Sequence, residues 1–261
     1  MLAEASTIQE VNPISFRCAS TIRTIAVGPT VTGSKCSECR LRAVCLPKGL
    51  SEADLEELGS LVFSHRRLKL AQALYRSGEA FQAIYLVRSG FIKTVVLLED
   101  GREQVTGLYM PGDMLGMDGL ASGSHTSDAI ALENSELCVV PYHRLENLEH
   151  QARGVQRQLH RMFSCEIVRE QRMMLLLGSM RAEERVAAFL LNLSERFTAL
   201  GYSPSDFVLR MTREEIGSLL GMKLETVSRI FSKFQKGALI EIEGKHVRII
   251  SIEGLRGVVA R

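Results

Sequence analysis

The sequence predicts an α+β protein built from a small antiparallel β-roll, one long helix and a C-terminal winged helix-turn-helix. Three patterns favour this class: short apolar runs separated by glycine turns between about residues 50 and 148, a proline-free helical period over 153–180, and a final helix, glycine turn, helix and hairpin. With 261 residues, 46% of them hydrophobic and 24% charged, the chain has an ordinary globular composition and enough length for two modest domains.

The N-terminal residues 1–35 are rich in Ser, Thr and Ala without a sustained period, and we expect a flexible arm there. The cysteine loop and β-roll should then occupy 36–152, the long helix 153–180, and the winged helix-turn-helix 181–261. The opening residues lack a basic segment followed by an apolar one, and apolar runs such as Met173 to Leu177 are too short to cross a bilayer. We therefore expect a cytoplasmic protein without membrane contact.

Glycine turns divide the predicted roll into short strands. Ser77-Gly78, Ser89-Gly90, Asp100-Gly101 and Pro111-Gly112 recur at close spacing. The strand-like runs between and after them are Ala83 to Val87, Phe91 to Leu98, Gln104 to Tyr109 and Leu137 to Val140. Regular short strands of this kind are typical of a small antiparallel barrel or sandwich.

The long helix carries an apolar stripe at spacings of three or four residues or their multiples. Its apolar members are Leu159, Phe163, Ile167, Met174 and Leu177. Spacing alone favours ordinary core packing. At position 170, however, the stripe has a glutamate in place of an apolar residue. Burying an unpaired charge in a core would be costly in free energy. The carboxylate therefore favours a dimer interface formed by all six residues, tunable through Glu170.

The C-terminal pattern begins with a capping box, in which Thr212 is followed three residues later by Glu215. Gly221 ends this first helix, and a second helix is predicted from about Leu224 to Lys236. The sequence "IEIEGKHVRII" then predicts a hairpin that turns near Gly244. Two short helices, a glycine turn and a hairpin are typical of a winged helix-turn-helix.

On the second of these helices, Glu225, Ser228 and Arg229 share one face. Arg can donate two hydrogen bonds to guanine, Glu can accept from the cytosine amino group, and Ser can adapt to several bases. Thr226, Lys223 and Lys245 complete the predicted contact set for double-stranded DNA. A solvated helical face would explain three charged residues by themselves, but the order of helix, turn, helix and hairpin favours DNA recognition.

Charge supports this interpretation only locally. The whole chain has a formal charge of +2, whereas residues 222–261 hold eight Lys or Arg against four Glu. Residues suited to phosphate contacts flank the reading face and the hairpin: Lys223, Lys233, Lys236, Lys245 and Arg248. A single unit covers few base pairs, so we expect a homodimer on two-fold sites.

The stretch "KCSECRLRAVC" places Cys36, Cys39 and Cys45 within eleven residues. In a reducing compartment, clustered cysteines more often bind a metal or react than form disulfides. Thiolates bind soft metals and iron-sulfur clusters, commonly four at a time. Three further cysteines could supply the fourth ligand: Cys18, Cys138 and Cys165. Cys138, in a predicted strand, is the best placed, but spacing does not distinguish zinc from iron, and free thiols remain possible.

The roll, the long helix and "TREEIGSLLGMKLETVSRI" together resemble the CRP/FNR family of bacterial transcription regulators over roughly residues 36 to 250. The FNR group of oxygen sensors has three clustered N-terminal cysteines and one in an "ELCVVP"-like strand. The resemblance implies one [4Fe-4S] cluster per subunit on Cys36, Cys39, Cys45 and Cys138, converted by oxygen to [2Fe-2S] with loss of the dimer and of DNA binding. It also implies that "E-x-x-S-R" reads TTGAT half-sites, and that roll turns such as Glu99 to Arg102 contact RNA polymerase.

The branch of this family that binds cyclic AMP uses a Gly-Glu and an Arg-Ser pair, and this sequence departs from both. "PGDMLGMDGLASGSHTSDAIA" has Met117 and His125 near those positions, and no Lys or Arg occurs from Glu103 through His143. A cyclic phosphate needs a cation or a nest of amides. We therefore expect no cyclic nucleotide.

The resemblance thus implies an oxygen-responsive global regulator of anaerobic gene expression that activates, represses or does both. An enzyme is not expected, because the chain contains no P-loop, HExxH or GxSxG motif. Two alternatives remain on the same fold: a zinc- or thiol-dependent DNA-binding regulator, and a small-ligand sensor that uses the roll as a pocket.

Overall fold

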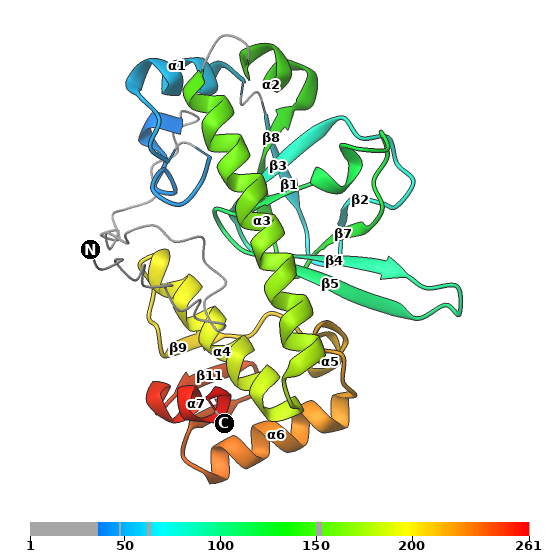
Figure 1. The fold of residues 1–261 in the computed structure, drawn as a ribbon, viewed down its shortest axis with the longest axis vertical. Coiled ribbons are helices and arrows are strands. Elements are labelled where there is room, and N and C mark those ends of the chain that lie inside the picture. The colour runs from blue at the N-terminus through cyan, green and yellow to red at the C-terminus, as the bar shows by residue number, and fades with distance from the viewer. Residues whose placement is uncertain (1–35, 47, 62–63, 150–152, 261) are drawn as a thin grey trace, which may run out of the picture.

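A computed structural model describes residues 36–46, 48–61, 64–149 and 153–260. The expected flexible arm and Cys18 lie outside these residues. Helix α3 (Arg153–Ser179) extends along most of the molecule. At one of its ends lie α1 (Glu52–Leu61) and α2 (Tyr142–Glu149), and at the other lie the C-terminal helices (Figure 1). No helix in the described ranges is long and apolar enough to span a membrane.

The β-roll consists of two four-stranded sheets in which all pairings are antiparallel. The first has the order β1 (Ser64–Leu68), β8 (Ser135–Pro141), β3 (Ala83–Ser89) and β6 (Met114–Leu115). The second has the order β2 (Ala73–Tyr75), β7 (Asp128–Ala131), β4 (Ile92–Leu97) and β5 (Glu103–Tyr109). Apolar residues from both sheets, among them Leu74, Val87, Ile92 and Leu137, form the core of the roll. The predicted α+β class and β-roll are therefore confirmed.

The C-terminal part packs a three-stranded sheet, in the order β10-β11-β9, with four helices. Its elements are α4 (Ala182–Ala199), β9 (Asp206–Val208), α5 (Arg213–Leu220), α6 (Leu224–Lys236), β10 (Ile240–Glu243), β11 (His246–Ile249) and α7 (Ile252–Val259). The capping box is formed: Thr212 Oγ1 accepts from the Glu215 amide at 3.1 Å, and the Glu215 carboxylate accepts from the Thr212 amide at 2.7 Å. Gly221 ends α5 at φ +64°, a conformation that glycine adopts readily.

Some elements differ from the sequence expectation. The strand-like pattern was expected to begin near residue 50, but Glu52–Leu61 is the helix α1. Its start is fixed by Ser51, whose hydroxyl accepts from the Asp54 amide at 3.2 Å and donates to the Asp54 carboxylate at 2.7 Å. Short elements carry little periodicity, and the sequence therefore did not predict several of them. These are the helices α2 and α7 and the strands β1, β2, β6, β7 and β9.

Gly90 connects β3 to β4 at φ +83°, and a Cβ there would lie 2.7 Å from the Ser135 backbone Cα. Gly90→Ala should therefore lower the free energy of unfolding by more than the about 1–2 kcal/mol of left-handed strain alone. Gly101→Ala is the matched control, because Gly101 has the same φ and open space around it. Urea unfolding of both variants gives the comparison, and equal losses would contradict the predicted clash.

Candidate metal centre and nucleic-acid interface

Consecutive turns fold the cysteine loop. The 3₁₀-helix η1 spans Cys36–Glu38, the Cys39 amide donates to the Cys36 carbonyl at 3.3 Å, and the Cys45 amide donates to the Leu41 carbonyl at 2.9 Å. Leu41 and Leu46 are both buried, so the loop is held by apolar side chains as well as by its own turns.

The fourth predicted ligand, Cys138, lies on β8 between two neighbouring strands. Its Cα is paired with His65 on β1 and with Leu86 on β3, so the backbone position is fixed on both sides. Alternate residues of a strand face opposite sides of the sheet. Leu137 accordingly packs into the core of the roll, while Cys138 packs with the apolar cluster that includes the cysteine loop.

All four predicted cysteines line one cavity, which holds about 390 Å³ of space, open solvent included. Cys45 is buried, the other three are partly buried, and all four are free thiols. The remaining lining residues are Leu41, Leu46, Leu58, Leu86, Val87 and Arg88. Among the described residues, no three His, Cys, Asp or Glu side chains lie close enough together to hold a single metal ion. The four cysteines therefore line a cavity whose other walls are largely apolar.

Burial raises the pKa of three of these thiols. Burial, reinforced by Cys39, raises the pKa of Cys36 to about 11, although Arg88 acts in the opposite direction. Burial, together with Cys36 and Cys39, raises the pKa of Cys138 to about 12, and burial also raises the pKa of Cys45. Four thiolates in such a place need compensating positive charge, which a metal centre would supply. The chemistry of the four thiols therefore fits an iron-sulfur centre, which several thiolates hold together around more than one metal ion.

The cysteine loop shares its apolar cluster with the start of α3. Leu46 and Leu58 belong to the same buried group as Val155 and Leu159 of that helix, and Met162 and Phe163 pack against it. A shift of the cysteine loop would therefore alter the packing of the first turns of α3.

The structure divides the predicted dimer stripe into inner and outer members. Leu159 is fully buried in its own chain, and Phe163 and Leu177 pack partly against intrachain cores. Ile167 and Met174 are 59% and 66% exposed, and Glu170 between them is also exposed. Burial and then the neighbouring Glu166 raise the pKa of Glu170, while Arg169 lowers it. Spacing placed all six on one stripe, but it does not show which of them the chain itself covers.

The predicted recognition helix α6 has a buried face and a free face. Val227, Ile230, Phe231 and Phe234 are buried in the C-terminal core. Glu225 and Arg229 are exposed and Ser228 is partly exposed, as reading the edges of bases would require. Partly exposed Thr226 accepts a long 3.5 Å hydrogen bond from Arg229 Nη2.

The flanking cations differ in how free they are. Lys223, which precedes α6, and Lys245, in the β10–β11 turn, are exposed. Lys233 instead lies 2.6 Å from the Glu183 carboxylate, and Arg248 lies 3.4 Å from Glu241. The phosphate contacts predicted for Lys233 and Arg248 would therefore compete with existing ion pairs.

In the region of the roll that departs from the cyclic AMP pattern, the Asp118 carboxylate occupies the nearby backbone amides. Asp118 accepts hydrogen bonds from the Thr126 amide at 2.9 Å and the Ser127 amide at 3.2 Å, and lies 3.0 Å from His125 Nδ1. His125 is 3% exposed and stacks on Tyr75 at 3.6 Å between ring centroids. The Thr126 and Ser127 amides, which could otherwise bind an anion, are thus already bonded to Asp118. The sequence analysis did not predict this role for Asp118, although Asp118 is next to Met117.

Contacts between the β4–β5 hairpin and α5 were also not predicted. Lys93 Nζ donates to the Glu215 carboxylate at 2.7 Å, and the Val105 amide donates to Ser218 Oγ at 2.8 Å. Burial opposes ionisation of Glu215, but hydrogen bonds from Lys93 and Thr212 lower its pKa overall. These partners lie more than 100 residues apart in sequence, so no local pattern could reveal them.

Comparison with known proteins agrees with this architecture. Residues 184–258 match the Crp-like helix-turn-helix domain, and residues 65–151 match the cyclic nucleotide-binding domain. The solved structure of FixK2 from Bradyrhizobium japonicum has a TM-score of 0.70 with 29% sequence identity, covering 76% of this chain and 98% of that one.

Curated relatives match over most of their length. The transcriptional regulatory protein Btr of Bordetella pertussis is 43% identical, over 87% of this chain and 93% of the relative. The transcriptional activator protein Anr of Pseudomonas protegens is 45% identical, over 82% and 88%. The fumarate and nitrate reduction regulatory protein of Escherichia coli is 39% identical, over 84% and 88%. The chain therefore belongs to the CRP/FNR family of transcription regulators, with a DNA-binding helix-turn-helix and no enzymatic role.

Proposed function

We propose that this regulator senses oxygen through a [4Fe-4S] cluster held by Cys36, Cys39, Cys45 and Cys138, and controls anaerobic gene expression in the cytoplasm. The observation that carries the proposal is the convergence of four thiols, from a loop and a distant strand, on one cavity with largely apolar walls. The similarity to Anr and to fumarate and nitrate reduction regulatory proteins supports the same function.

The cysteines would act by fixing the loop to β8. When bound, a [4Fe-4S] core supplies iron-thiolate bonds that oxygen can disrupt. With those bonds in place, three loop sulfurs are tied to Cys138, and Leu46 stays packed in the cluster that contains Val155 and Leu159. Without them, the loop keeps only its turns and its apolar contacts. The first turns of α3 then lose part of their support.

The homodimer interface would use the outward-facing part of α3. Ile167 and Met174 provide apolar surface there, and Glu170 interrupts it. If two copies of Glu170 approach within ~4 Å at an effective dielectric of ~20, their repulsion is about 4 kcal/mol, comparable with burying a couple of apolar side chains. The interface would therefore be marginal, so that modest support from the cysteine loop decides whether two chains associate.

In the dimer, two copies of α6 would read the halves of a two-fold TTGAT-type site. Arg229 suits guanine, Glu225 suits the cytosine amino group, and Ser228 adapts between them. Lys223 and Lys245 would contact phosphates. The β4–β5 turn, which includes exposed Asp100 and Arg102, is the proposed contact with RNA polymerase.

Anaerobically purified protein should contain about four iron and four sulfide per chain, and Cys39→Ser should lose most of both. Ser37→Ala is the matched control, because it changes the same 3₁₀ turn without removing a thiol. The measurements are the absorption spectrum, metal analysis including zinc, and light scattering before and after air exposure. Zinc in place of iron, or a dimer that air leaves unchanged, would contradict the proposed sensor.

Glu170→Ala should give a dimer that persists in air and still binds DNA, because the repulsion across the interface is removed. Light scattering in air and a gel-shift assay check this outcome. Glu99→Ala removes the same charge from the exposed β4–β5 turn and should leave the aerobic protein monomeric. An aerobic Glu170→Ala protein that stays monomeric would refute the role given to this carboxylate.

Arg229→Ala should weaken binding to a TTGAT-type site by about 1–3 kcal/mol and relax preference at the guanine. Lys236→Ala, at the exposed end of α6, should weaken binding evenly across sequences. Binding isotherms on sites substituted one base at a time separate the two effects. Equal losses on all sequences for Arg229→Ala would make Arg229 a phosphate contact instead.

A further inference from the structure

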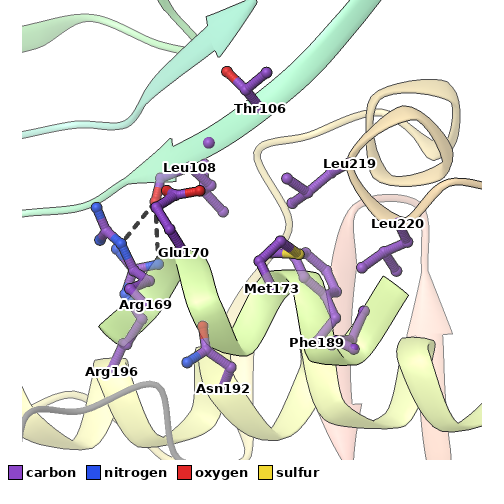
Figure 2. Close-up of a pocket in the computed structure, with 12 residues that line it drawn as sticks. Thr106, Leu108, Arg169, Glu170, Met173, Phe189, Asn192, Arg196, Leu219 and Leu220 are labelled. Carbon is purple, nitrogen blue, oxygen red and sulfur yellow. Dashed lines mark hydrogen bonds between the residues drawn. The ribbon is translucent and has the colours of Figure 1, made fainter. Parts of the chain in front are cut away.

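A second cavity lies where the roll, the long helix and the DNA-binding domain meet (Figure 2). Its walls come from β5, α3, α4 and α5, and it holds about 550 Å³ of space, open solvent included. Most of the lining is apolar, with Leu108, Met173, Leu176, Phe189, Leu219 and Leu220 contributing. It is separate from the cysteine cavity and shares no lining residue with it.

One polar group in this wall lacks a partner. Asn192 of α4 is only 8% exposed, and its Nδ2 has no hydrogen-bond partner within the described part of the chain. In Figure 2 the Asn192 amide lies between Arg196 on one side and the apolar side chains of Met173 and Phe189 on the other. A buried amide donor without an acceptor costs about 1–3 kcal/mol, so a ligand that supplies the acceptor recovers that free energy.

The two guanidinium groups at the site are already occupied. Arg196 donates to the Leu108 carbonyl at 3.2 Å and pairs with Asp113, and Arg169 pairs with Glu166. Glu170 adds a third carboxylate, so two cations face three potential anions. This balance disfavours an anionic ligand and leaves the Asn192 amide as the polar group in need of a partner.

We propose that this cavity binds a small, uncharged, mostly apolar molecule whose carbonyl or ether oxygen accepts a hydrogen bond from Asn192 Nδ2. The apolar body of the ligand would cover Met173 and Phe189 on one side and Leu219 on the other. A single water is a poorer occupant, because an ordered buried water usually has about three polar partners and these walls are mainly apolar.

A matched pair of probes tests this assignment in the full chain. 4-Fluoroacetophenone carries the carbonyl acceptor, and 4-fluoro-α-methylstyrene has the same shape with a methylene in place of the oxygen. Fluorine NMR titrations give both dissociation constants. The wild-type protein should bind the ketone about 5-fold to 10-fold more tightly than the styrene. Equal affinities, or no binding of either probe, would overturn the proposal.

Two variants locate the binding. Asn192→Leu keeps a similar side-chain volume without the donor, so the ratio of the two constants should fall to about one. Met173→Trp should fill the cavity and weaken both probes about equally. A ketone preference that survives Asn192→Leu, or unchanged affinities in Met173→Trp, would place the probes elsewhere and refute the site. Because the first readout is a ratio within one protein sample, partial unfolding does not imitate it.

Discussion

The proposed link between the cysteine loop and the long helix depends on the apolar cluster that joins the loop to the start of α3. Leu46 from the loop and Leu159 from the helix lie in one buried group, which also contains residues of β3 and β8 from the roll. Burial of side chains of this size contributes about 1.5–3 kcal/mol each. A metal centre at the loop would therefore act on α3 through direct packing, and no long-range relay is needed.

Sequence reasoning predicted the parts with strong local signals. The α5 capping box, the glycine that ends α5 and the bounds of α6 were read correctly, since each depends on a few neighbouring residues. The four cysteines were selected by spacing and by family resemblance, and the structure brings them to one cavity. Their role as cluster ligands stays a prediction.

What the sequence did not reveal depends on contacts between distant segments. Leu159 and Met174 lie on the same helical stripe, yet one is buried by its own chain and the other is exposed. Only the packing of α1, α2 and the loop on α3 separates them. The role of Asp118 was not predicted for a similar reason. Asp118 accepts hydrogen bonds from the amides of residues 126 and 127, and only the fold brings those amides close to it.

The bond between Lys93 and Glu215 limits how freely the two domains can be exchanged between relatives. Glu215 belongs to the capping box of α5 and also accepts a hydrogen bond from Lys93 of the roll. One carboxylate therefore both caps a helix and joins the DNA-binding domain to the roll. A chimera that joins this C-terminal half to a roll without a cation at position 93 would keep the cap but leave a partly buried carboxylate without its ammonium partner. Exchange of either half therefore requires that the new partner supply the matching charge at this contact, even though each half is a recognisable module.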